Sequence, residues 1–176
     1  VVREDLLVEV GRLCKEFGFD KVPTVVGGGM ERRHSVQAGL REVRPDAALI
    51  AIHDGARPLV SQEIIRDTVA RAAITGAAAP AIPLTDTIKR EDGGLTVETV
   101  DRSQLWAVQT PQVFEAGLIR AATQKALDDG EVLTDDCGAV ELLGMKVTLT
   151  SGSRENLKVT TPLDLILGEA ILRARA

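Results

Sequence analysis

The chain has 176 residues, a length that fits one domain of ordinary size. Hydrophobic residues make up 44% of the sequence and charged residues 27%, which excludes a disordered chain, and no apolar stretch is long enough to predict a membrane span. The 21 Lys and Arg residues against 26 Asp and Glu residues give a net charge of −5, without any basic run. Neither nucleic acid nor a membrane is therefore an expected partner.

The first residues of the chain and its two cysteines indicate the cellular compartment. Cys14 and Cys137 lie far apart and lack the spacing of a zinc site or a disulfide framework, so they are predicted to be small buried residues in a reducing compartment. Residues 1–5 include no Met and lack the charged region and apolar core of a signal peptide. The sequence therefore predicts a cytoplasmic protein.

Short β-branched runs alternate with amphipathic stretches along the chain. This alternation is typical of βαβ units and predicts an α/β fold with a mostly parallel sheet. A first helix is expected over residues 6–17, with Gly18 directly after its last turn. A strand at 22–26 and a second helix with its apolar seam at 36–43 follow.

The next unit repeats this plan with strands expected at 48–52 and through 81–82. Ser61 is a good N-cap for the helix between them, which is expected to end at Gly76. Further on, one helix is predicted near 115–127, another near 135–143, a strand at 147–149, and a last helix that Pro162 opens.

Between residues 84 and 102 the alternation is interrupted. Asp92-Gly93-Gly94 is a hairpin signal, and apolar and polar residues alternate after it. This pattern predicts an antiparallel β-arm inserted at about 84–102. The chain as a whole, 1–176, is predicted to be one domain.

Ligands of open α/β sheets bind at the carboxyl ends of the strands, and the segments that follow the predicted strands are polar. In 27–36, bare glycine backbone can approach a flat or anionic ligand, and Ser35 lies in the first turns of a helix. A flexible strand-to-helix turn with solvated arginines would account for the same segment.

The loop 53–58 follows a predicted strand directly. Asp54 is placed to hold a divalent cation and Arg57 to receive an anion or a polyol hydroxyl, although the two could instead form a structural ion pair. His53 is expected to make local hydrogen bonds. Because the chain has only two histidines, the sequence favours a reaction driven by charge stabilisation over acid–base catalysis.

Hydroxyl groups and cations recur in the remaining polar segments, which are 86–89, Arg102, 109–112, 134–136 and 156–162. Together they suit an oxygen-rich phosphorylated substrate. Taken singly, some of them are equally well explained as helix caps.

Five segments, in order and at the same spacing, resemble those of the 2-C-methyl-D-erythritol 4-phosphate cytidylyltransferase family: 28–36, 53–58, 86–89, 109–112 and 156–162. The resemblance spans essentially the whole chain. It implies a Rossmann-like nucleotidyltransferase sandwich. It also implies the transfer of CMP from CTP to a sugar-alcohol phosphate, with release of pyrophosphate, in the non-mevalonate route to isoprenoid precursors.

The resemblance further implies roles for individual residues. These are Gly28, Glu31 and Ser35 for the cytidine, Asp54 for the nucleotide and Mg²⁺, Arg57 and Thr134 for the polyol, and the catalytic pair Arg102 and Lys158 for the substrate phosphate, helped by Thr87 and Thr110. In such enzymes the arm completes the site of a partner subunit. A homodimer is therefore expected, in which Thr87 and Arg102 serve the neighbouring chain.

Family members begin with a strand, a glycine-rich loop ending in an arginine and a nearby lysine, which this sequence does not contain. We expect that the natural beginning of the protein lies upstream of Val1. Two alternatives stay open: a cytidylyltransferase for a pentitol phosphate such as ribitol 5-phosphate, and a non-catalytic dimeric relic that binds its ligand without turnover.

Overall fold

The computed structural model describes residues 1–175, which divide into two compact units. The first unit comprises Val1–Ile50 and Glu115–Met145, and the second comprises Ala51–Phe114 together with the chain from Lys146 onward. None of the helices within the described residues is long and apolar enough to cross a membrane.

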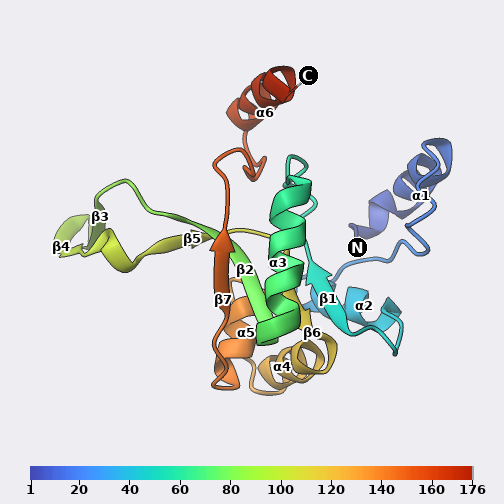
Figure 1. Cartoon of the computed structure of the whole chain (residues 1–176), viewed down its shortest axis with the longest axis horizontal. Coiled ribbons are helices and arrows are strands. Elements are labelled where there is room, and N and C mark those ends of the chain that lie inside the picture. Colours follow the sequence, from blue (N-terminus) through green and yellow to red (C-terminus); the bar gives the residue numbers. More distant parts are fainter. Residues whose placement is uncertain (176) are drawn as a thin grey trace. The chain divides into compact units, whose positions relative to one another are not determined.

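The first unit is built from helices: η1 (Glu4–Leu6), α1 (Leu7–Glu16), α2 (Arg32–Glu42), α4 (Ala116–Asp128) and α5 (Asp136–Leu142) (Figure 1). The four predicted helices of this unit are thereby confirmed. Arg120 of α4 donates hydrogen bonds to the carbonyl oxygens of Leu40 and Val43, at 2.7 and 3.0 Å. It thus satisfies carbonyl groups that the end of α2 leaves without helical partners.

The strand predicted at 22–26 is wrong. The structure shows only an isolated parallel bridge between Val2 and Gly27 there. Pro23 lies inside the predicted strand and lacks the backbone N–H that a central strand needs, so the valines of this run do not form a ladder.

The second unit contains most of a five-stranded sheet, formed by β1 (Leu49–Ile52), β2 (Ala77–Pro83), β5 (Trp106–Val108), β6 (Gln112–Glu115) and β7 (Thr148–Ser151). Its order is β1-β6-β2-β5, and β7 also pairs with β2. The central strand β2 runs parallel to β7 but antiparallel to both β5 and β6.

The prediction of a mostly parallel sheet is therefore wrong around β2, and β5 and β6 were not predicted at all. Alternation of apolar and polar residues reports burial, not strand direction. Opposite Ala81 lies Val108, and opposite Ala78 lies Val113, so five steps along β5 and β6 match three along β2. The intervening residues, including Gln109 and Thr110, form a bulge. Because these residues are polar, the segment was predicted as a loop and the two strands beside it were not recognised.

The helices of the second unit are α3 (Gln62–Thr75) and α6 (Pro162–Arg175), as expected. The Ser61 hydroxyl accepts a hydrogen bond from the backbone N–H of Ile64, and Gly76 ends α3 in the left-handed region at φ 80°. A serine N-cap and a glycine C-cap therefore set both ends of α3.

The predicted arm is confirmed as a separate two-stranded antiparallel sheet of β3 (Ile88–Asp92) and β4 (Leu95–Val100), which projects to the left in Figure 1. Gly93 and Gly94 form its tip with φ values of 59° and 84°, a conformation that L-residues with a side chain rarely adopt.

The two cysteines differ in burial. Cys137 is buried in α5, and burial, helped by the nearby Asp135 carboxylate, raises the pKa of its thiol far above the usual range. Cys14 is half-buried. The prediction of a buried small side chain is confirmed for Cys137 and only in part for Cys14.

Glu115 caps the N-terminus of α4, and this cap makes stability depend on pH. Its carboxylate accepts hydrogen bonds from the backbone N–H groups of Gly117 and Leu118, at 2.9 and 2.6 Å, which hold the pKa of Glu115 below its usual value. Because the pKa is lowered in the folded state, the cap stabilises fully above the unfolded pKa, and its contribution is lost as the pH falls through the folded pKa.

We therefore expect Glu115→Gln to lower the free energy of unfolding by roughly 0.5 kcal/mol at pH 7, with the difference vanishing in acid. Urea denaturation at pH 7 and pH 3 measures both values. The fully exposed Met30→Gln is the control, because neither side chain carries a titratable group and its effect should be the same at both pH values. An equal loss for Glu115→Gln at both pH values would contradict the charged cap.

Candidate functional site

Asp54 lies directly after β1 and is held there by a chain of hydrogen bonds. Its backbone N–H donates to the Thr110 hydroxyl at 3.0 Å, and that oxygen lies 2.9 Å from Nδ1 of His53. The other ring nitrogen, Nε2, lies 3.1 Å from the carbonyl oxygen of Arg57. Since a carbonyl only accepts, Nε2 donates to it, and in the neutral ring Nδ1 then accepts from the Thr110 hydroxyl. His53 thus makes local hydrogen bonds, as predicted, and fixes this loop.

Two cations meet the Asp54 carboxylate. Oδ2 lies 3.0 Å from Nζ of Lys158 and 3.6 Å from Nε of Arg57. The side chains of Asp54 and Arg57 are only 18% and 13% exposed, whereas Lys158 is 47% exposed. The structural ion pair considered for Asp54 and Arg57 is thus present, and Lys158 adds a more accessible positive charge.

The buried residue Asn156 holds the groups around Asp54 in place. Asn156 is fully buried and donates from Nδ2 to the carbonyl oxygen of Thr110 at 3.0 Å and to Oε1 of Gln109 at 3.3 Å. The carbonyl oxygen of Asn156 accepts from Nη1 of Arg57 at 2.6 Å. One residue thereby fixes both the bulge that carries Thr110 and the guanidinium of Arg57. We name Asp54, Arg57, Thr110, Asn156 and Lys158 the Asp54 cluster.

The remaining predicted residues of this unit, Thr87 and Arg102, lie at the root of the arm. Thr87 is exposed and directly precedes β3, while Arg102 follows β4 in η2 (Arg102–Gln104) and donates to the carbonyl oxygen of Thr85. Within the described residues no hydrogen bond or ion pair joins either of them to the Asp54 cluster. That Thr87 and Arg102 contribute to the site of a neighbouring chain stays a prediction.

In the first unit, residues 28–31 form a tight turn before α2, and Ser35 lies in the first turn of that helix. Ser35 Oγ accepts from the backbone N–H of Gly29 at 3.2 Å. A Cβ at Gly28 would lie 2.6 Å from Ser35 Oγ, and one at Gly29 would lie 2.3 Å from the Cβ of His34. The structure therefore places Gly28 and Glu31 in a turn with bare backbone, next to Ser35 of α2; their role with cytidine stays a prediction.

This close approach predicts that Gly29→Ala is destabilising, by about 1–3 kcal/mol, because the backbone of α2 must shift to admit the methyl group. Thermal denaturation measures the loss. Gly11→Ala in α1 is the control, since nothing lies within 4 Å of its added Cβ, and it should be neutral or stabilising. Equal effects of the two changes would contradict the tight turn.

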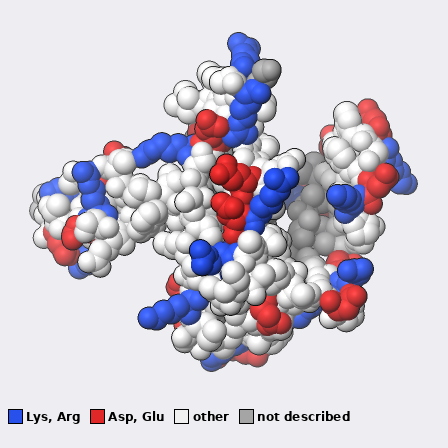
Figure 2. All heavy atoms as spheres, viewed as in Figure 1, with Lys and Arg blue, Asp and Glu red and all other residues white. Residues whose placement is uncertain are grey.

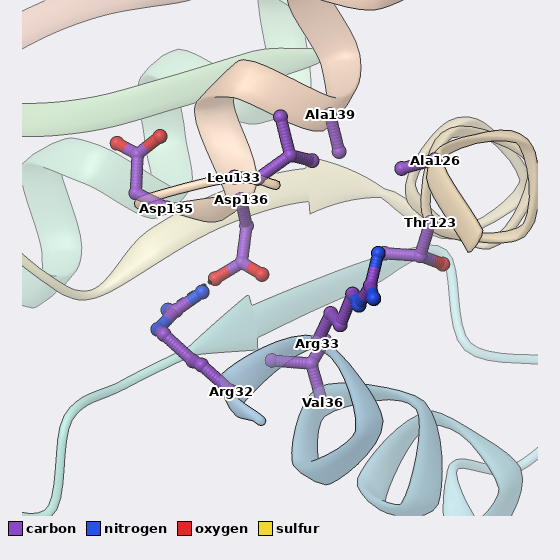
Figure 3. A pocket seen from close by; sticks show the side chains of 9 residues that line it. All are labelled: Arg32, Arg33, Val36, Thr123, Ala126, Leu133, Asp135, Asp136 and Ala139. Atoms are coloured by element: carbon purple, nitrogen blue, oxygen red, sulfur yellow. Dashed lines mark hydrogen bonds and ion pairs between the residues drawn. The ribbon is translucent and has the colours of Figure 1, made fainter. Parts of the chain in front are cut away.

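A small pocket of about 20 Å³ lies between the first turns of α2 and the helices α4 and α5 (Figure 3). Arg32 points at the buried Asp136, with Nη2 2.6 Å from Oδ2, and Arg33 donates from Nη1 to the carbonyl oxygen of Glu131 at 2.8 Å. These bonds tie the turn to the segment that carries the exposed Thr134.

The predicted residues thus fall into groups. Gly28 and Glu31 lie in the turn before α2 of the first unit, next to Ser35 of that helix, and Thr134 lies in the same unit on the segment that Arg32 and Arg33 hold. The second unit holds the Asp54 cluster and the root of the arm. Sequence reasoning gave no role to Arg32 or to Asn156; the only available signal for Asn156 was its place in the polar segment 156–162.

The predicted Mg²⁺ site has one carboxylate. The described residues contain no group of three or more His, Cys, Asp or Glu that could hold a metal ion. Mg²⁺ in nucleotide enzymes is commonly bound by one or two carboxylates together with substrate phosphates. Asp54 therefore fits a cation shared with a triphosphate and does not fit a cage made of protein ligands alone.

Known proteins match nearly the whole chain. A family model described as 2-C-methyl-D-erythritol 4-phosphate cytidylyltransferase matches residues 4–174. The chain is 46% identical over 166 residues to a protein of that name from Alkaliphilus metalliredigens, covering 94% of this chain and 69% of that relative. For one from Halalkalibacterium halodurans, the identity is 46% over 172 residues, covering 98% and 75%.

The fold has solved counterparts as well. A crystal structure of 2-C-methyl-D-erythritol 4-phosphate cytidylyltransferase from Thermus thermophilus superimposes with a TM-score of 0.78 at 36% identity, covering 84% of this chain and 72% of that chain. The α/β architecture is therefore shared with a nucleotidyltransferase of known structure.

Proposed function

Because this chain belongs to the 2-C-methyl-D-erythritol 4-phosphate cytidylyltransferase family, we propose that it transfers CMP from CTP to 2-C-methyl-D-erythritol 4-phosphate and releases pyrophosphate, in the cytoplasm, on the route to isoprenoid precursors. The observation that carries the proposal is the Asp54 cluster, where a carboxylate and two cations follow a strand end on a rigid polar support.

The reaction needs charge stabilisation more than proton transfer. An oxygen of the acceptor phosphate attacks the α-phosphorus in line, a new P–O bond forms, and the bond to the β-phosphate bridging oxygen breaks, its electron pair leaving with pyrophosphate. The acceptor phosphate is already largely ionised near pH 7, so no general base is required. This agrees with a site whose one histidine uses both ring nitrogens in local hydrogen bonds.

Residues of the Asp54 cluster supply the groups that this reaction needs. Lys158 offers an exposed ammonium to the negative charge that develops around the α-phosphorus, and Asp54 holds that ammonium in place. Arg57, fixed by the carbonyl oxygen of Asn156, presents its guanidinium to the polyol. Asp54 would hold Mg²⁺, and the chemistry supplied there would be further positive charge for the leaving pyrophosphate.

We assign cytidine binding to the bare backbone of the Gly28 turn with Glu31 and Ser35. Polyol contacts are assigned to Thr134 and phosphate contacts to Thr87 and Arg102. The Thr110 hydroxyl, expected to help with the phosphate, is buried and bonds to Asp54 and His53, so Thr110 positions Asp54 instead. The glycine turn supports the first assignment because a base can approach backbone that carries no Cβ.

The arm supports the proposal of a homodimer. An isolated two-stranded ribbon is marginally stable in water, and this ribbon leaves Leu95 and Val97 73% and 58% exposed. A second copy of the chain would cover these side chains. Light scattering should give the mass of a dimer, and Val97→Lys should shift the protein to monomers; a monomer in both cases would contradict the assembly.

Release of pyrophosphate tests the function. The protein is incubated with CTP, Mg²⁺ and 2-C-methyl-D-erythritol 4-phosphate, and in parallel with ribitol 5-phosphate as acceptor. Faster release with the methylerythritol phosphate supports the proposal. A preference for ribitol 5-phosphate, or ligand binding without turnover, would overturn it.

A further inference from the structure

Two arginines converge on one residue at the root of the arm. Arg102 donates from Nη1 to the carbonyl oxygen of Thr85, and Arg154 donates from Nη2 to the Thr85 hydroxyl at 3.2 Å. Arg154 lies in the loop between β7 and α6, 69 residues from Thr85 in sequence. The tertiary structure alone therefore brings the second guanidinium to this place.

The acids next to the two arginines in sequence do not pair with them: Asp101 bonds to Ser103, and Glu155 pairs with Arg175. Within residues 1–175 neither Arg102 nor Arg154 has an ion-pair partner, and both side chains are exposed. Neighbouring like charges repel each other, and an anion between them would remove that cost. Lys and Arg side chains line the connection between the arm and the sheet in Figure 2.

The donors of this pair suit a phosphate group. A guanidinium has five N–H donors in a planar fork, and the contacts with Thr85 use one donor of each arginine. The others can bind the oxygens of a phosphate monoester, a dianion whose charge matches two guanidinium groups. The Thr87 hydroxyl lies two residues from Thr85 on the same exposed segment.

We propose that Arg154 is a second phosphate-binding residue, which works together with Arg102 on the phosphate monoester of the acceptor. The inference rests on the proposed function and adds a residue to it. Lys158, in the same loop, has a different place, because its ammonium forms an ion pair with Asp54. Because both guanidinium groups reach Thr85, they are placed to bind the same phosphate group.

Steady-state kinetics with varied acceptor and varied CTP tests this role. Arg154→Gln should raise the KM for the phosphorylated acceptor about tenfold and leave the KM for CTP unchanged. The acceptor KM of Arg154→Lys should lie between those of the wild type and Arg154→Gln. Arg66→Gln removes an exposed arginine of α3 in the same unit and is the matched control. An Arg154→Gln protein with the KM values of Arg66→Gln would overturn the proposal.

A second variant separates binding from mere support of the loop. Thr85→Val removes the hydroxyl to which Arg154 donates but keeps both positive charges. It should leave the acceptor KM close to the wild-type value. A rise as large as that of Arg154→Gln would show that Arg154 only orders the segment, and would overturn the proposal.

Binding of inorganic phosphate provides a readout that does not depend on turnover. The arginine side-chain N–H signals of Arg102 and Arg154 are followed by NMR during a phosphate titration. Both should shift with one common Kd, and Arg154→Gln should weaken that Kd about tenfold at Arg102. Shifts at Arg102 alone would overturn the role of Arg154, even if the protein proves to have another acceptor.

Discussion

Asp54→Asn is expected to lower kcat for pyrophosphate release by about a hundredfold or more while the fold is kept, since electrostatic groups at a phosphoryl centre contribute effects of this size. Asparagine has nearly the same shape, so the packing around the loop is preserved. It lacks the charge that holds the ammonium of Lys158 at 3.0 Å and that would bind Mg²⁺.

The stability cost of this change should be small. Arg57 and Lys158 lose the charge between them, but the ammonium of Lys158 is 47% exposed and water screens it. A loss of about 1–2 kcal/mol in the free energy of unfolding is expected, most of it from Arg57, which is only 13% exposed. Asp67→Asn, an exposed acid of α3, is the control for both measurements.

The comparison of kcat with Tm decides between the two explanations of the Asp54–Arg57 pair. A large loss of activity with only a small fall in Tm indicates a functional carboxylate. If Asp54→Asn lowers the Tm as strongly as it lowers activity, the pair is a structural one, and the role of Asp54 in nucleotide and metal binding is refuted.

Asn156→Ala is expected to be the most destabilising change of a single polar side chain in the second unit. It removes the donor to the carbonyl oxygen of Thr110 and to Gln109, in a place without solvent. The carbonyl oxygen of Thr110 loses this donor at a cost of about 1–3 kcal/mol, whereas Oε1 of Gln109 keeps the N–H of Ser153. Because the missing amide also leaves a void, a loss of roughly 2–4 kcal/mol in the free energy of unfolding is expected.

Activity should fall with this variant as well, because Asn156 positions two members of the Asp54 cluster. Its amide holds the bulge with Thr110, and its carbonyl oxygen holds Arg57. Urea denaturation gives the stability, and kcat is measured well below the variant's Tm. Gln62→Ala, on the exposed face of α3, is the control. A stability equal to that of Gln62→Ala would show that the buried network contributes nothing.

Local signals in the sequence were sufficient for the helices and the arm. Ser61 and Gly76 fix the ends of α3, and the Asp92-Gly93-Gly94 signal fixes the hairpin, because capping and left-handed turns depend on neighbouring residues only. The direction of the strands beside β2 depends on which segments meet, and no periodicity reports it. That is why the antiparallel pairing beside β2 was not predicted, whereas β5 and β6 themselves were missed because of the polar bulge between them.

The same distinction applies to the site. By itself the sequence determined which residue types follow the strands and, through five ordered segments, the family. Only the tertiary structure decided that Lys158 joins Asp54, that Asn156 supports both Thr110 and Arg57, and that Arg154 meets Arg102 at Thr85. These contacts join residues far apart in the chain, and their partners are chosen by packing and by the need to pair buried polar groups.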